Sequence, residues 1–222
     1  MVISYFGGEC FKITQGDLTL ALNLPSKESN LPAGRQGKNS VKFGSDIVLV
    51  SQDTPDFNGV ENASFGERQP FIINGPGEYE IKGVAVRGYP STPFDSAQGK
   101  SLGTSGRECI TTIYSVVLEG MTLCFLGPIS NPVLPAGAMQ ELDAVDILFL
   151  PIGGGDVLDH RDAYKLAVQL GPKVVVPMHY DAPALKAFLK EAGVEGVQQQ
   201  EKFTVKKKDL EGKEAEVVVL MG

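Results

Sequence analysis

The sequence predicts an α/β fold in which two mixed β-sheets pack face to face with helices on the outside. Short strands separated by glycine-rich turns fill the first half of the chain, and buried strands alternate with helices in the second half. Apolar residues make up 42% of the 222 residues, which is typical of a globular chain with a substantial core. We therefore expect one domain that spans residues 1–222.

The first strands are expected where turns separate short apolar runs, at residues 2–6, 10–13 and 18–22. A fourth apolar run, residues 47–50, ends abruptly in a polar turn. Such a run is typical of a strand buried on both faces. The loop that leaves the C-terminal end of such a strand is a usual place for a functional site.

Further strands follow the same rules of burial and turn chemistry. Three short strands are expected within residues 70–89, and a hairpin over residues 111–126 turns at Glu119-Gly120. Two more strands are expected at residues 146–151 and 173–178. The tail predicts a last hairpin, formed by residues 202–207 and 216–220.

Two helices are expected in the last third of the chain, at residues 159–170 and 183–192. In the first of them, apolar residues recur at the spacing of one helix face: Ala163, Leu166, Ala167 and Leu170. Asp159 can cap its start, and Gly171-Pro172 ends it.

Two polar insertions interrupt these elements, at residues 27–40 and 92–108. Both are rich in residues that form turns and show no periodicity, so we expect surface loops outside the core.

Composition excludes several classes of function. The net charge of −7 argues against nucleic-acid binding and against an anionic membrane surface. No apolar run reaches the length of a membrane span and no leader opens the chain, so a cytoplasmic protein is expected. The three cysteines have neither disulfide nor zinc-finger spacing. Cys10 and Cys124 are expected in the core. The oligomeric state stays open.

Several motifs resemble those of one family. Residues 51–57, Ser-Gln-Asp-Thr-Pro-Asp-Phe, resemble the loop Thr-His-x-His-x-Asp-His that opens the metal site of metallo-β-lactamase-fold proteins. Leu150-Pro151-Ile152-Gly153 and Pro177-Met178-His179-Tyr180 resemble two further motifs of that family. Residues 75–84 resemble its small stand-alone branch of zinc-dependent hydrolases. The resemblance covers nearly the whole chain and implies a four-layer αββα sandwich.

The metal-binding motif of that family is degenerate in this chain. Gln52, Thr54 and Phe57 fall where the resemblance places three histidines. Phe125 stands for a further histidine and Pro128 for an aspartate that bridges the metals. Phenylalanine offers no lone pair, and zinc binds neutral amide or hydroxyl oxygens poorly.

Asp56 and His179 are the two ligands of the family pattern that remain, and Asp53 could add a second carboxylate. One imidazole and one or two carboxylates make a weak zinc site, although Mg²⁺ or Mn²⁺ could use such oxygens. We therefore expect no cofactor, with a weakly bound divalent metal as the alternative. Equally, His179 could bond neighbouring backbone and Asp56 could cap a turn.

We expect Asp56 and His179 to hydrogen-bond to each other at the junction of the two sheets, flanked by Phe57 and Phe125. The expected pocket around them is lined by Gln52, Asp53, Thr54, Phe57, Phe125, Gly153, Gly154 and Tyr180. Two functions are consistent with this pattern. The first is a non-catalytic protein that binds a small molecule or a protein. The second is a hydrolase of a small ester, lactone or phosphoester with a rebuilt metal site, whose catalytic residues would be Asp56 and His179.

Overall fold

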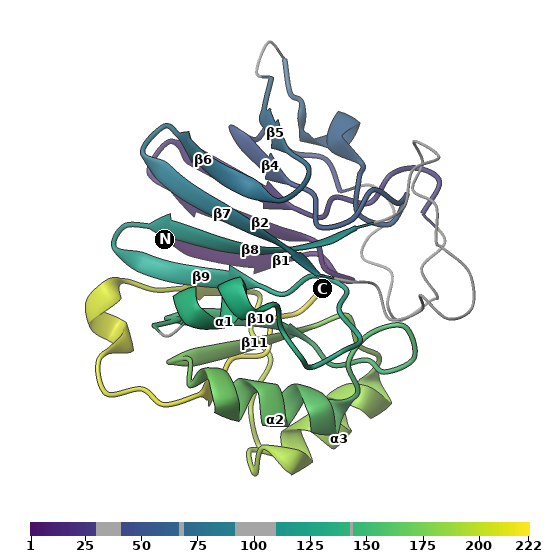
Figure 1. Cartoon of the computed structure of the whole chain (residues 1–222), viewed down its shortest axis with the longest axis vertical. Helices are drawn as coiled ribbons and strands as arrows, with labels where there is room; N and C mark the ends of the chain where they lie inside the picture. Colours follow the sequence, from purple (N-terminus) through teal and green to yellow (C-terminus); the bar gives the residue numbers. More distant parts are fainter. Residues whose placement is uncertain (30–40, 67–68, 92–109, 143) are drawn as a thin grey trace.

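The computed structural model describes residues 1–29, 41–66, 69–91, 110–142 and 144–222. Two β-sheets pack against each other (Figure 1). The first sheet has the order β12-β1-β2-β3-β4-β5, formed by Lys202–Thr204, Val2–Tyr5, Phe11–Gln15, Leu18–Leu22, Ile47–Leu49 and Phe71–Ile73. The second has the order β13-β11-β10-β9-β8-β7-β6, formed by Glu216–Val217, Val174–Met178, Ile147–Pro151, Met121–Phe125, Thr111–Leu118, Val84–Ser91 and Gly77–Ile81.

Both sheets are mixed, as predicted. In the first, β1, β2 and β3 are antiparallel, and β4 and β5 continue the sheet parallel to β3. In the second, β6 to β9 are antiparallel, and β10, β11 and β13 continue it as parallel strands. The C-terminal ends of the parallel strands are where such sheets place their sites.

The main core lies between the inner faces of the two sheets. The Phe125 and Phe149 rings stack with their centroids 4.0 Å apart, and Phe11 meets Phe149 edge-on at 4.8 Å. These three side chains are almost completely buried. Each buried ring of this size stabilises the fold by about 1.5–3 kcal/mol. The aromatic contacts therefore join the first sheet to the second across the interface.

Three α-helices lie on the outer face of the second sheet: α1 (Ala136–Glu141), α2 (His160–Leu170) and α3 (Ala182–Glu191) (Figure 1). The Asp159 side chain accepts hydrogen bonds from the backbone at the start of α2, and Gly171 ends that helix at φ 55°. Both predicted helices are confirmed, whereas α1 was not expected from the sequence. Six residues are too few for a periodic pattern to stand out.

The outer face of the first sheet is covered differently. In the described part of the chain, the 3₁₀ helix Val60–Ala63 and the segment that carries Val41 and Phe43 pack over β3 and β4. Cys10 lies in this outer cluster and Cys124 in the cluster under the helices, so both are core residues as predicted. Cys109 lies outside the described residues.

The predicted hairpin at the C-terminus is wrong. The strands β12 and β13 form, but β12 pairs with β1 in the first sheet and β13 pairs with β11 in the second. The 3₁₀ helix Lys207–Leu210 and the turn after it carry the chain from one sheet to the other. Each strand completes the edge of a sheet built by distant residues, so the local pattern could not reveal its partner.

The insertions predicted at 27–40 and 92–108 fall almost wholly outside the described residues. Of the first, the described residues are 27–29, of which Lys27 and Glu28 are exposed. Within the described chain, no helix combines the length and apolar character that crossing a bilayer requires.

Two buried aspartates lie at equivalent places, each directly before a strand that has a parallel neighbour. Asp46 precedes β4, and its carboxylate accepts hydrogen bonds from the Thr19 N–H at 2.8 Å and from Lys82 at 2.6 Å. Asp146 precedes β10 and accepts from the Thr122 N–H at 2.8 Å. Lys173 and Lys207 each lie 2.7 Å from the Asp146 carboxylate. Each aspartate therefore sets the register of the strand that follows it.

The pKa of Asp146 is lowered in the folded protein. Burial, the largest single influence, raises the pKa, but the hydrogen bonds from Lys173, Lys207 and the Thr122 N–H together outweigh it. Because the unfolded pKa is about 3.9, the unfolded chain binds this proton more readily. The stability that Asp146 supplies is therefore present above about pH 4 and is lost as the pH falls through the lower folded pKa.

We expect Asp146→Asn to lower the free energy of unfolding by about 2–3 kcal/mol near pH 7, because it leaves two ammonium groups without their carboxylate. Urea titrations at neutral pH and near pH 3 measure the difference. It should shrink at the lower pH, because near pH 3 the unfolded chain already binds this proton and the stability supplied by the ionised carboxylate is falling.

Asp162→Asn is the matched control, since Asp162 makes an exposed ion pair with Lys165. We expect a change within about 0.5 kcal/mol. Equal losses in the two variants would show that Asp146 has no special structural role.

Candidate functional site

Four polar side chains from four separate segments meet at one end of the sandwich. Glu9 comes from the β1–β2 turn, Asn23 directly follows β3, Ser51 follows β4, and His179 directly follows β11. All four are buried. We call Glu9, Asn23, Ser51 and His179 the polar cluster. It joins the first sheet to the second at the C-terminal ends of their parallel strands.

The hydrogen bonds of the polar cluster are continuous. Nδ1 of His179 lies 2.9 Å from Oε1 of Glu9. The Asn23 side-chain amide donates to Oε2 of Glu9 and to the Ser51 hydroxyl, both at 3.1 Å. The Ser51 N–H donates to the Asn23 side-chain oxygen at 2.8 Å. The Glu9 carboxylate thus uses both oxygens, as a buried carboxylate must.

The backbone at these positions is constrained. Asn23 and His179 have left-handed conformations, with φ of 47° and 52°. Asparagine tolerates this region, whereas histidine adopts it at some energetic cost. The His179 N–H donates to the Gly8 carbonyl at 2.7 Å, and that carbonyl also accepts from the Tyr5 hydroxyl at 2.8 Å. The β1–β2 turn therefore holds His179 through both its backbone and its ring.

Burial raises the pKa of Glu9, and the hydrogen bonds from His179 and Asn23 oppose that rise. Burial also raises the pKa of Tyr5 well above its ordinary value. The same cause raises the pKa of Tyr180 to about 12. The tyrosines around the polar cluster are thus neutral hydrogen-bonding groups at physiological pH.

Two buried polar atoms near this end of the sandwich have no hydrogen-bond partner among the described residues: Nε2 of His179 and the Thr54 hydroxyl. The Phe57 ring lies beside the His179 ring, with centroids 6.3 Å apart. Because Nδ1 is used by Glu9, Nε2 is the ring nitrogen that remains for another group.

The predicted pair of Asp56 and His179 is wrong. Asp56 accepts a hydrogen bond from the Ser29 hydroxyl at 2.7 Å, whereas His179 bonds Glu9. Burial decides this outcome, because the Glu9 carboxylate is enclosed and must find a donor, and the imidazole of His179 supplies it. Phe57 flanks His179 as predicted, but Phe125 packs on Phe149 in the core between the sheets.

The hydrogen bonds made by the other predicted pocket residues go to several different partners. The Gln52 amide donates to the Thr111 hydroxyl at 3.3 Å, and Asp53 accepts from Asn58 at 2.8 Å. The remaining three lie in the loops after β10 and β11. Gly153 is half-buried, the Gly154 N–H donates to the Leu158 carbonyl at 2.9 Å, and the Tyr180 hydroxyl donates to the Leu220 carbonyl at 3.2 Å.

Sequence reasoning missed Glu9, Asn23 and the role of Ser51 in bonding. Glu9 is an acidic residue in a short turn between two apolar strands, Tyr5-Phe6 before it and Cys10-Phe11 after it. Its position between two buried strands was the one sign in the sequence that Glu9 could be buried. That sign is weak, because glutamate in a turn is usually exposed.

The two-sheet fold agrees with the protein family whose model matches this chain. The family model described as the beta-lactamase superfamily domain matches residues 2–179. The chain belongs to the metallo-β-lactamase superfamily. Its match includes every segment of the polar cluster, from the β1–β2 turn to His179.

Relatives within the metallo-β-lactamase superfamily share a common description. A UPF0173 metal-dependent hydrolase of Listeria monocytogenes is 24% identical over 201 residues, which cover 82% of this chain and 86% of that protein. A UPF0173 metal-dependent hydrolase of Nanoarchaeum equitans is 41% identical over 115 residues, half of each chain. A third, from Carboxydothermus hydrogenoformans, is 46% identical over 43 residues, 19% of each chain. The chain thus spans half or less of the length of the last two.

Solved structures show the same fold. A candidate zinc-dependent hydrolase of the metallo-β-lactamase superfamily from Thermotoga maritima superimposes with a TM-score of 0.69 at 22% identity, covering 99% of this chain and 97% of that one. A metallo hydrolase from Ignicoccus hospitalis gives a TM-score of 0.62 at 20% identity, covering 92% and 99%. These matches confirm the predicted sandwich.

We expect His179→Ala to lower the free energy of unfolding by about 2–4 kcal/mol, because Glu9 is left buried without its imidazole partner. Urea denaturation measures this as a lower midpoint at unchanged slope. In the Glu9→Gln background the same substitution should cost less, giving a coupling energy above about 1 kcal/mol.

His160→Ala is the matched control, because His160 is the other histidine and lies partly exposed at the start of α2. Its effect should stay within about 0.5 kcal/mol. The structural role of the Glu9–His179 contact would be refuted by equal effects of the two histidine substitutions.

Proposed function

We propose that this protein is a non-hydrolytic member of the metallo-β-lactamase superfamily, in which the polar cluster takes the structural place of the metal centre. The site is proposed to bind a small molecule without catalysing its hydrolysis. One observation carries the proposal: His179, the last histidine of the family pattern, is held by a buried carboxylate of the opposite sheet.

The donor set supports this proposal. Among the described residues, no group of three or more His, Cys, Asp or Glu side chains could hold a metal ion. Four further positions at which the resembled motifs carry histidine hold Gln52, Thr54, Phe57 and Phe125. Of these, Gln52 and Phe125 are engaged elsewhere. Neutral oxygens and aromatic rings do not fit a zinc centre of the family's kind.

The remaining polar groups suit recognition of a neutral polar ligand. Nε2 of His179 and the Thr54 hydroxyl are buried and bond none of the described residues, so a ligand that bonds them would remove an energetic cost already present in the protein. The Phe57 ring beside His179 offers an apolar surface to the same ligand.

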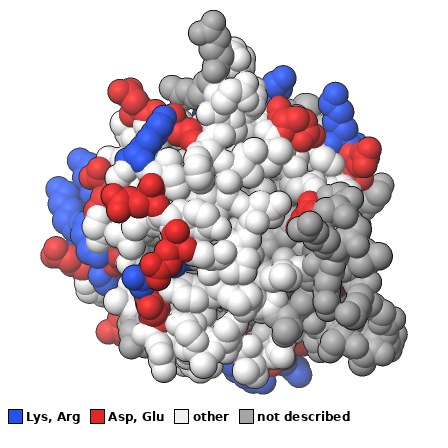
Figure 2. All heavy atoms as spheres, turned by 45° about the horizontal axis from the view of Figure 1, so that its top comes forward, with Lys and Arg blue, Asp and Glu red and all other residues white. Residues whose placement is uncertain are grey.

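Surface charge gives no support to a nucleic-acid partner. In the view of Figure 2, basic residues are interspersed with acidic ones near the margins, and the coloured residues form no broad basic surface. The net charge of −7 points the same way. Partners of the site are accordingly proposed to be small molecules.

A hydrolase with a rebuilt metal site is the second candidate, and a specific contact favours it. Metal-ligating histidines commonly donate their second ring N–H to a carboxylate, and Glu9 makes such a contact with Nδ1 of His179. That contact leaves Nε2 facing no protein partner among the described residues. The relatives described as metal-dependent hydrolases favour the same candidate.

We expect protein purified without added metal to contain far less than one zinc per chain, and chelator to leave its melting temperature unchanged. The physical reason is the missing third strong ligand. Metal analysis by mass spectrometry and thermal unfolding with and without chelator measure the two quantities. Added Zn²⁺ should produce no turnover of β-lactams, lactones or phosphodiesters.

The second candidate predicts a different result for the same samples. Stoichiometric zinc, or turnover that disappears in an Asp56→Ala, His179→Ala double variant, would overturn the proposal. His160→Ala is the control for the effect of removing a histidine elsewhere on the chain.

A further inference from the structure

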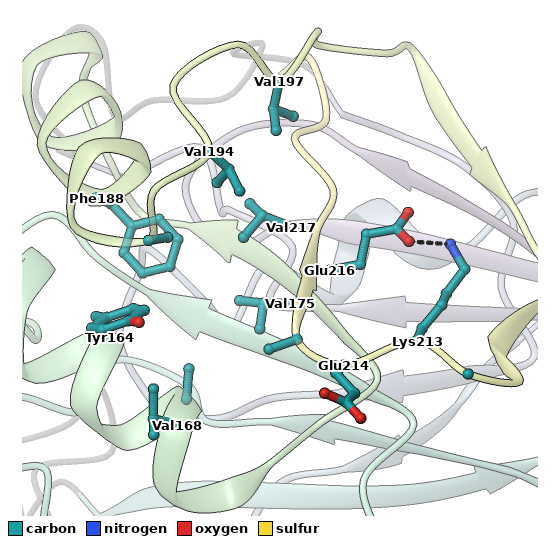
Figure 3. Close-up of a pocket in the computed structure, with 14 residues that line it drawn as sticks. Tyr164, Val168, Val175, Phe188, Val194, Val197, Lys213, Glu214, Glu216 and Val217 are labelled. Atoms are coloured by element: carbon teal, nitrogen blue, oxygen red, sulfur yellow. Dashed lines mark hydrogen bonds and ion pairs between the residues drawn. The ribbon is translucent and has the colours of Figure 1, made fainter.

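A groove with its own set of lining residues lies between the two long helices and the edge of the second sheet. Its volume is about 630 Å³, within the range of small-molecule sites. Side chains of α2 and α3, the segment after α3, and the strands β11 and β13 line it (Figure 3). None of the four residues of the polar cluster contributes to its walls.

The walls of the groove are mainly apolar. Val175 and Val217 form part of the sheet surface, and the Tyr164 and Phe188 rings face the groove from the helices (Figure 3). Val168 on α2 is 60% exposed, although α2 otherwise buries its apolar residues against the sheet. Val175, Val217 and Phe188 are themselves buried. The hydrocarbon surface left in water, which a ligand would cover, is therefore that of Val168 and of the partly exposed Val194 and Val197.

The mouth of the groove is acidic. Lys213 and Glu214, in the turn that leads into β13, and Glu216, the first residue of β13, lie on one side of it (Figure 3). Lys213 is already bonded to Glu216 at 2.6 Å, so the cation and one carboxylate offset each other. Glu214 is exposed and supplies the remaining negative charge. An apolar body that ends in a cation complements this arrangement, and the Tyr164 ring adds a face that favours cations.

We propose that this groove binds a small amphipathic amine, with its hydrocarbon body on the valines and its ammonium group at Glu214. A carboxylic acid of the same shape would cover the same apolar surface but would meet the Glu214 carboxylate with like charge. The negative charge of Glu214 therefore favours an ammonium ligand over an acid. This proposal does not depend on the function proposed for the polar cluster.

The test compares 4-phenylbutylamine with 4-phenylbutyrate by isothermal titration calorimetry on the full chain. The two probes share one hydrocarbon body and differ in the sign of their charge. We expect the amine to bind at least about tenfold more tightly than the acid at low salt, and added salt to narrow the difference. Equal binding of the two probes, or binding of neither, would overturn the proposal.

Two variants locate the binding. Glu214→Gln should weaken the amine about fivefold and leave the acid unchanged or slightly improved. Val168→Lys should abolish amine binding by placing an ammonium in the groove. Val133→Lys is its matched control, because Val133 is 76% exposed and lies outside the groove. Circular dichroism and melting temperatures confirm that each variant is folded.

Sedimentation velocity covers the other occupant of an exposed apolar groove, a second copy of this chain. We expect no self-association through the groove: any rise of the sedimentation coefficient with protein concentration should be the same in the Val168→Lys variant. Self-association abolished by Val168→Lys but not by Val133→Lys would make the groove an interface between copies and would contradict the amine proposal. Unchanged amine binding in Glu214→Gln would also contradict it.

Discussion

The burial of the two inner sheet faces against each other is the constraint on which the rest of the structure depends. Phe11, Phe125 and Phe149 meet at the middle of this interface, where each ring covers another. Because an apolar interface cannot satisfy polar groups, hydrogen-bonding side chains are confined to its ends. At the start of β4 and β10, the buried Asp46 and Asp146 bond a neighbouring strand and lysine side chains, which fixes the order in which the strands pair.

The polar cluster lies at the other end of the apolar interface, where its buried side chains hydrogen-bond to one another. Four loops converge there, and in metallo-β-lactamase-type motifs such loops carry histidines that hold metal. Here the Glu9 carboxylate is the shared partner: it accepts a hydrogen bond from the Asn23 amide of its own sheet and contacts His179 of the second sheet. A bonded carboxylate–imidazole contact can join two sheets without a cation, provided that every lone pair of the carboxylate finds a donor. Nε2 of His179 has no hydrogen-bond partner among the described residues, and the function proposed above depends on this atom.

The groove beside β13 follows from the way the second sheet ends. The strand β13 has two residues and, in the described part of the chain, pairs with β11 at the edge of the sheet. Beside this short edge strand, Val168 stays exposed and Val194 and Val197 stay partly exposed, and these side chains line the groove. The polar cluster and the groove are thus independent products of one architecture, the first at strand ends and the second at a sheet edge.

Local patterns in the sequence determined the strands of residues 2–22, the hairpin around Glu119-Gly120, and α2 with its Asp159 cap, because turn chemistry and helix periodicity act over a few neighbouring residues. The family motifs also located two of the four loops that meet at the polar cluster, those that carry Ser51 and His179. Only the tertiary structure decided that β12 and β13 belong to different sheets, and that His179 bonds Glu9 while Asp56 bonds Ser29. Glu9 and His179 are 170 positions apart, and their contact exists because folding encloses that carboxylate where water cannot solvate it.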